Sequence, residues 1–392
     1  MRIAFLIYLA LMGAQVTLVS TLLPTSVDPR LIAVIPVLLV GIVAGRAHHR
    51  RQPMTPIFHS AWLLVALLVL SLAWTTESGR TMVAILTWAA LILAGAWIVP
   101  EVTTAQLVRY IRGLLVLAIA ASLALHTLGW PSAVEGGRLR GIMENANGLG
   151  LVCALALPLL LTLRFRYLVL LIPPWTYTLY LTGSRASALA SAIAAGVFVL
   201  QNTPKRYRFL SWAAAVLVGP FVAVPLIQDI VRESTSTILR TNDSRSEIWA
   251  RALAIFADSP IYGAGLNPLG NTVIGSSFVR ILAELGVLGA ATYLLMIRDH
   301  YRGAKGVPWA EALLAACLVN GIFESWLFLA GSFFYVLTYL LLLGPRRDRM
   351  VKGKADLSTH TAPQRSMPMR HTSVLAAGSP RNQPLRLPTG RR

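Results

Sequence analysis

The sequence predicts an all-α polytopic membrane protein. Hydrophobic residues make up 56% of its 392 residues and charged residues only 13%, and the mean hydropathy is +0.64. In soluble globular proteins, in contrast, about a quarter of all residues are charged. The apolar residues also fall into repeated runs of about 15–21 residues, which is close to the length of a membrane-spanning helix. Because only helices and closed barrels satisfy their backbone groups in lipid, such runs indicate helices.

Twelve such runs are present, so we expect about twelve transmembrane helices in a domain that covers residues 1–344. The first run also fits a signal peptide, but it extends to Leu23, which is longer than a signal core, and we expect it to form the first helix. The predicted helices span roughly residues 3–23, 31–45, 57–74, 81–99, 110–128, 147–163, 167–182, 186–200, 211–227, 277–297, 309–327 and 328–343.

The charges of the loops predict the orientation. If the helices alternate in direction, 25 of the 35 lysines and arginines, including all four lysines, fall on one side together with both ends of the chain. Basic loop residues concentrate on the cytoplasmic side, so we expect both termini in the cytoplasm. Residues 345–392 hold eleven of these basic residues and are rich in Pro, Ser and Thr, which predicts a disordered tail. The tail either attracts anionic lipids or only fixes the orientation.

The other ten basic residues are all arginines and fall on the outer side, against the usual loop bias. A guanidinium stays charged and binds phosphate oxygens bidentately, so these side chains suit a diphosphate whose lipid tail remains in the bilayer. Arg185 is the strongest candidate, because it lies in the short loop Thr182–Ser187 between two apolar runs. The alternative for each arginine is a contact with lipid headgroups or an ion pair with Glu135, Asp243 or Asp258.

The longest outer loop, residues 228–276, contains a predicted helix. Ser244 and Glu247 have the spacing of a capping box, which opens a helix over about residues 245–258. Its apolar residues recur at helical spacing, so we expect it at the membrane surface or packed on the bundle. Arg245 begins this helix, where free backbone amides also favour an anion. We expect the other arginines of this loop to face solvent or headgroups: Arg232, Arg240 and Arg251.

Two further groups are candidates for contacts with the rest of the substrate. The loop after the fifth run carries Arg138 and Arg140 beside glycines, and then Asn145 and Asn147, whose amides suit sugar hydroxyls. Glu284 lies inside the tenth predicted helix. A carboxylate within a membrane helix is either functional or part of a structural ion pair, and both interpretations are open.

Four segments over residues 130–295 follow one another in a distinctive order. They are Arg138-Leu-Arg-Gly141 with Asn145-Ala-Asn147, then Gly183-Ser-Arg185, then Arg245-Ser-Glu-Ile-Trp249 with Pro260 and Gly263-Ala-Gly265, and finally Ile281-Leu-Ala-Glu284-Leu-Gly286-Val-Leu-Gly289. In this order, with about twelve helices, they resemble the O-antigen ligase and O-antigen polymerase superfamily of bacterial polytopic membrane glycosyltransferases.

The resemblance implies transfer of a glycan from an undecaprenyl-diphosphate carrier to a glycan or glycolipid acceptor. The reaction would take place at the outer face of the bacterial cytoplasmic membrane, among membrane lipids and without a metal, cofactor or nucleic acid. By similarity, Arg185 and Arg245 would bind the diphosphate and stabilise the charge of the leaving group.

One segment departs from the pattern. Ligases of the family have a His-Asn pair shortly before the glutamate of the tenth helix, whereas this chain has Ile274-Gly-Ser-Ser277. We therefore expect a polymerase-like or divergent member, with Glu144 or Glu247 as a candidate general base, or no strong base at all.

Two other functions stay open. The first is a transporter or flippase for a lipid-linked or anionic substrate, a class whose members usually have repeated halves with helices interrupted at the membrane midplane. The second is a non-catalytic, divergent member of the same family. The sequence has no convincing internal repeat and its polar residues gather on one face, which favours the enzyme.

Overall fold

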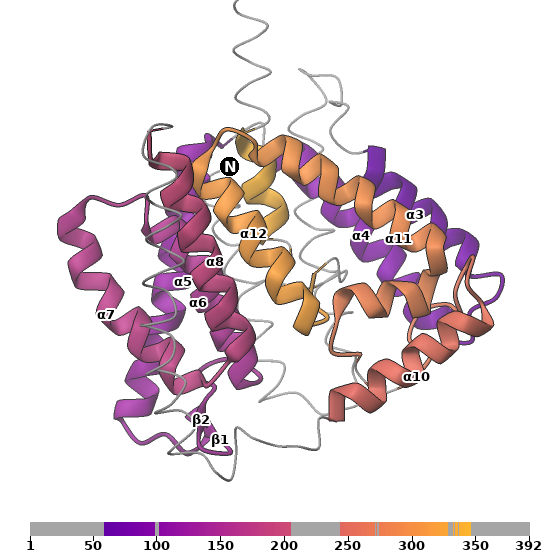
Figure 1. Ribbon diagram of the computed structural model, residues 1–392, viewed down its shortest axis with the longest axis horizontal. Helices are drawn as coiled ribbons and strands as arrows, with labels where there is room; N and C mark the ends of the chain where they lie inside the picture. The colour runs from indigo at the N-terminus through magenta and orange to yellow at the C-terminus, as the bar shows by residue number, and fades with distance from the viewer. Residues whose placement is uncertain are drawn as a thin grey trace, which may run out of the picture. The chain divides into compact units, whose positions relative to one another are not determined.

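The computed structural model describes residues 59–98, 102–204, 244–270, 272, 274–327, 332, 334–335 and 337–345. These residues are mostly helical, as Figure 1 shows. The helices are α3 (His59–Ser71), α4 (Ser78–Ile98), α5 (Thr104–Thr127), α6 (Ala146–Leu160), α7 (Phe165–Thr182), α8 (Arg185–Asn202), α10 (Ser244–Asp258), α11 (Ser277–Ala304) and α12 (Pro308–Phe323).

Each of these helices lies where the sequence predicts one. α10 begins at Ser244, as the capping-box spacing predicts. Within the described ranges, α5 and α11 are long and apolar enough to cross a membrane, while α3, α6 and α12 are apolar but shorter. The helical class is therefore confirmed. The count of twelve stays a prediction, since residues 3–23, 31–45, 211–227 and the tail from 346 onward lie outside the described residues.

Small side chains hold α6, α8 and α12 together. Alanines from all three helices form one fully buried cluster, which consists of Ala154, Ala190, Ala194, Ala312 and Ala316. Gly150 extends this contact, because a Cβ atom at that position would lie 2.7 Å from the Cβ of Ser184. Small residues let helix backbones approach closely, which is how helices associate in lipid without a hydrophobic driving force.

α8 and α12 run in opposite directions. Asn320 in the last turn of α12 donates to Ser187 in the first turn of α8, with 3.1 Å between Nδ2 and Oγ. At their other ends, Gln201 of α8 donates to Glu311 of α12. The antiparallel arrangement brings helix ends far apart in sequence to the same level.

One group of helix ends is rich in polar side chains and will be called the polar end. It comprises the starts of α6, α8 and α11 and the ends of α7 and α12, which hydrogen bonds described below link to one another. All of these ends belong to the side that the loop charges predict to be external.

α11 differs from the prediction. The sequence predicts one continuous helix over residues 277–297, but the helix is interrupted at Gly286, whose φ of 62° and ψ of −156° are not helical. Segment 260–265 fills the interruption. Ala264 and Gly265 donate to the carbonyls of Ala283 and Glu284, and residues 287 and 288 donate to the carbonyls of residues 260 and 261. The backbone groups freed by the break are thus bound again, as a membrane interior requires.

Glycines make this docking possible. A Cβ atom on Gly286 would lie 2.5 Å from the carbonyl oxygen of Ile261, and one on Gly263 would lie 2.5 Å from the carbonyl of Glu284. Both residues also have positive φ values. The two glycine motifs that stand apart in the sequence therefore meet backbone to backbone.

A short hairpin precedes α6 and is not among the predicted elements. Strands β1 (Val134–Glu135) and β2 (Arg138–Leu139) pair antiparallel, and Gly136 and Gly137 form the turn with φ values of 57° and 76°. Two successive positive φ values suit a tight hairpin turn and favour glycine at both positions.

Candidate functional site

Arg138 ties the hairpin to the polar end. Its Nε donates to the carbonyl of Thr182 at 2.7 Å, and its NH2 group donates to Oδ1 of Asn147 at 2.6 Å. Gly183 lies directly beside it, since a Cβ atom there would be 3.3 Å from Arg138 Nε. Arg138 therefore joins strand β2, the end of α7 and the start of α6.

Arg185 is the first residue of α8 and lies next to this junction. Gly183 ends α7 in the left-handed conformation (φ 56°, ψ 22°), so the chain reverses within two residues before α8 begins. The side chain of Arg185 is exposed, while the neighbouring hydroxyls of Ser184 and Ser187 are buried and bonded to each other at 2.9 Å. A guanidinium and the first amides of a long helix thus share the polar end, a combination that favours an anion.

Glu324 completes the network, and sequence reasoning missed it. α12 ends at Phe323, so Glu324 is extended (φ −135°, ψ 146°) and not part of a helix to residue 327 as predicted. Its Oε1 accepts from Nδ2 of Asn147 at 2.9 Å, and its carbonyl accepts from the hydroxyl of Ser277 at 2.7 Å. Hydrogen bonds thus run from Arg138 through Asn147 and Glu324 to the start of α11.

Asn320, in the last turn of α12, stabilises the hydrogen-bonded network around Glu324. It is fully buried and, besides its bond to Ser187, accepts from the indole of Trp326 at 2.7 Å. A buried amide that is bound on both sides fixes the relative position of α8 and of the segment that carries Glu324.

Glu284 and Arg280 form a buried ion pair in the first half of α11. Arg280 Nε lies 2.8 Å from Glu284 Oε1, and only 13% and 7% of the two side chains are exposed. The same carboxylate oxygen accepts from the backbone amide of Asn267 at 3.0 Å. Of the two open interpretations of Glu284, the structural ion pair is therefore present, although the residue also lines a cleft.

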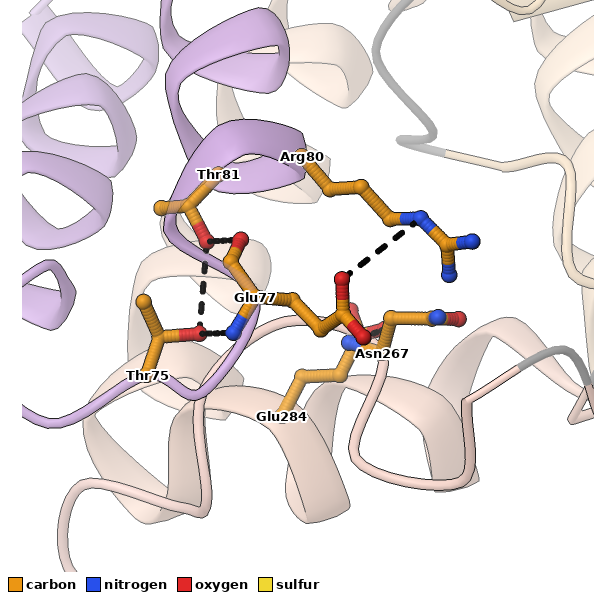
Figure 2. A network of polar contacts seen from close by, with 6 residues as sticks. All are labelled: Thr75, Glu77, Arg80, Thr81, Asn267 and Glu284. Atoms are coloured by element: carbon orange, nitrogen blue, oxygen red, sulfur yellow. Dashed lines mark hydrogen bonds and ion pairs between the residues drawn. The ribbon is translucent and has the colours of Figure 1, made fainter. Parts of the chain in front are cut away.

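That cleft lies between α3, α4 and α11. Its polar lining includes Arg80, Asn267, Ser277, Arg280, Glu284 and Tyr293. Figure 2 shows Glu77, from the loop before α4, and Arg80, from the first turn of α4, beside Asn267 and Glu284. Sequence reasoning did not select Arg80 or Asn267, because neither belongs to a recognisable motif.

Several predicted residues have partners within their own segment. Arg140 donates to the carbonyls of Ser132 and Glu144, and Asn145 caps α6 by accepting from the amide of Gly148. Both side chains therefore stabilise the loop after α5.

In α10, Glu247 forms an exposed ion pair with Arg251 one turn later. Arg245 is described only as part of the α10 backbone, and Arg232 and Arg240 lie outside the described residues. The convergence of Arg185 with Arg245 thus stays a prediction. Among the described residues, no three His, Cys, Asp or Glu side chains are grouped so as to hold a metal ion.

Comparison with known proteins supports the resemblance. The model of the O-antigen ligase family matches residues 167–294, about a third of the chain, from α7 into the second half of α11. No curated protein matches the chain. The matched segment contains Arg185, Arg245 and Glu284, whereas Arg138, Asn147 and Glu324 lie outside it. Residues 167–294 are therefore similar to the O-antigen ligase family, a family of membrane proteins.

Proposed function

We propose that this protein is a membrane glycosyltransferase of the O-antigen polymerase or ligase type. It moves a glycan from an undecaprenyl-diphosphate carrier to a glycan or glycolipid acceptor on the outer face of the bacterial cytoplasmic membrane. The observation that carries the proposal is the polar end, where Arg185 begins α8 beside the network of Arg138, Asn147 and Glu324. The family match covers this turn and α8 and supports the same function.

The chemistry places positive charge where the leaving group develops negative charge. In the proposed reaction an acceptor hydroxyl attacks the anomeric carbon of the donor sugar, the bond to the diphosphate breaks, and inversion follows. Arg185, with Arg245 as the family resemblance implies, binds the diphosphate oxygens. One well-placed donor of this kind contributes about 10²–10³-fold to the rate.

Glu324 is the best candidate for the general base among the carboxylates described. Glu247 is exposed and bound to Arg251, and Glu144 is exposed in the loop before α6. Glu324, in contrast, stands between the network of Arg138 and the start of α11. In this role the carboxylate takes the proton of the acceptor hydroxyl, which the histidine of family ligases is thought to do.

The test is glycan transfer by the purified protein with a polyprenyl-diphosphate-linked oligosaccharide as donor. We expect Arg185→Ala to lower the rate about 10²–10³-fold, with partial recovery in Arg185→Lys, which keeps the charge but loses the planar fork. The matched control is Arg166→Ala, an exposed arginine at the opposite end of α7 whose guanidinium stacks on Tyr167. Normal transfer by the inserted, folded Arg185→Ala protein would contradict the proposal.

The general base is tested by Glu324→Gln. The amide oxygen of glutamine still accepts from Asn147, so the network is kept while the ability to take a proton is lost. We expect a loss of about 10²–10⁴-fold in rate, and no comparable loss in Glu247→Gln. Equal activity of wild type and Glu324→Gln would show that the reaction uses another base or none.

One observation favours the alternative of a transporter: α11 is interrupted at Gly286, and transporters often bind their substrate at interrupted helices. In this chain, however, segment 260–265 binds the freed backbone groups on both sides of the break. Proteoliposomes separate the two functions. A transporter moves the lipid-linked glycan across the bilayer intact, whereas the proposed enzyme releases the polyprenyl diphosphate and lengthens or modifies the acceptor.

A further inference from the structure

The cleft between α3, α4 and α11 contains hydrogen-bonding groups that the protein leaves unused. Nδ2 of Asn267 is buried and has no acceptor within reach among the described residues. An unpaired buried amide donor is destabilising, so its position in the wall of a cleft points to a ligand that accepts from it. Asn267 also has a φ of 60°, a conformation that asparagine tolerates better than other side chains.

Glu284 offers the complementary group. Its two bonds, from Arg280 and from the amide of Asn267, both go to Oε1. Within the part of the chain that the structure describes, Oε2 therefore keeps its capacity to accept from another donor. An unused donor and an unused acceptor thus occur on residues that line the same cleft. A hydroxyl group, which donates and accepts at once, satisfies both.

The charges of the cleft argue against a phosphate. Arg280 is paired with Glu284 at 2.8 Å, and Arg80 lies 3.8 Å from Glu77. The two cations are thus balanced by two anions, and a diphosphate that entered would meet the Glu284 carboxylate without a compensating excess of positive charge. Phosphate oxygens moreover cannot donate to Glu284 when ionised. A neutral polyol has neither difficulty.

We infer that this cleft binds a neutral sugar unit of the acceptor glycan, held by Asn267 and Glu284 with Arg80 at the rim. The inference rests on the proposed function and deepens it. The cleft and the polar end are adjoining parts of one surface, because Ser277 lines the cleft and donates to the carbonyl of Glu324. The acceptor sugar thus lies on the cleft side of Glu324 and the diphosphate on the Arg138 and Arg185 side.

The experiment measures sugar binding apart from catalysis. The full-length protein in lipid nanodiscs is titrated with free D-glucose, D-galactose, D-mannose, L-rhamnose and N-acetyl-D-glucosamine, followed by saturation-transfer NMR, and inorganic pyrophosphate is tested as a competitor. We expect at least one sugar to bind saturably and pyrophosphate not to displace it. Arg185→Ala should leave the dissociation constant of the sugar unchanged.

Two variants at Asn267 test the site itself. Asn267→Gly removes the amide and tolerates the positive φ, while Asn267→Asp keeps the shape but replaces the donor with a charge. Each should weaken sugar binding about fivefold to tenfold, the effect of one lost hydrogen bond. The matched control is Asn202→Gly at the opposite end of α8, where the amide bonds only to the carbonyl of Phe198 in its own helix.

The outcomes separate the two proposals when glycan transfer is measured on the same preparations. Transfer without binding of any of these sugars, binding that pyrophosphate displaces, or equal binding by wild type and Asn267→Gly would overturn the sugar site and leave the glycosyltransferase proposal standing. Sugar binding that depends on Asn267, without any transfer by the wild type, would support the site and contradict the enzyme.

Discussion

Replacing Gly286 by alanine is the sharpest test of how α11 is built. The conformation at Gly286 (φ 62°, ψ −156°) is essentially restricted to glycine, and forcing another residue into it costs about 1–3 kcal/mol. The added Cβ atom would also lie 2.5 Å from the carbonyl oxygen of Ile261 and 2.7 Å from the amide nitrogen of Gly263. The backbone must therefore move, because neither contact involves a flexible side chain.

The expected loss follows from the hydrogen bonds at the break. The donors at residues 264, 265, 287 and 288 make four bonds between segment 260–265 and α11, each worth about 1 kcal/mol. If α11 closes into a continuous helix, residues 287 and 288 regain partners while 264 and 265 lose theirs. A continuous helix relieves the strain at residue 286 but leaves these two amides without acceptors, at about 1–3 kcal/mol each, so we expect Gly286→Ala to destabilise the protein by about 2–6 kcal/mol.

Thermal unfolding in detergent and hydrogen exchange measure the effect. We expect the Tm to fall by about 5–10 °C and the amides of Ala264 and Gly265 to exchange faster. Gly113→Ala is the matched control, since Gly113 lies within α5 with nothing inside 4 Å of an added Cβ atom. Equal Tm values for Gly286→Ala and Gly113→Ala, with the protection of segment 260–265 unchanged, would contradict this role of Gly286.

Two further predictions concern the buried charges and the topology. Arg280→Met should destabilise the protein by about 3–5 kcal/mol, because it leaves Glu284 buried without its partner. The double variant Arg280→Met/Glu284→Gln should recover part of that loss, and strictly additive losses in denaturant titrations would contradict the pairing. In intact spheroplasts, a membrane-impermeant maleimide should modify Glu135→Cys but reach Lys305→Cys only after permeabilisation, with little background because both native cysteines are fully buried. The reverse labelling pattern would invert the predicted orientation.

The helices could be predicted from the sequence because their signal is local. A long apolar run needs no knowledge of its neighbours, and α3 to α8, α11 and α12 lie where such runs are. The start of α10 is also a local signal, carried by Ser244 and Glu247. Hydropathy does not register backbone angles, however, so the run through Leu285, Gly286 and Val287 gave no sign of the interruption.

The site was less predictable because its contacts are distant in the sequence. Asn147 and Glu324 are 177 residues apart, and nothing near Glu324 marks it beyond a single carboxylate at the end of an apolar run. Local motifs pointed equally to Asn145 and Asn147, but the first caps a helix while the second reaches another element. Chemical type alone could not separate these two amides, since the difference lies in what each one faces.

The hydrogen-bonded chain from Arg138 to Ser277 bears on any exchange of parts between relatives. Residues 167–294 would carry Arg185 into a chimera, yet the groups bonded around it come from the hairpin, from the start of α6 and from the stretch after α12. A chimera that exchanges only residues 167–294 would contain the arginine without the residues that surround it in this structure. We therefore expect that changing the donor or acceptor preference requires exchange of the stretches on both sides of residues 167–294 as well.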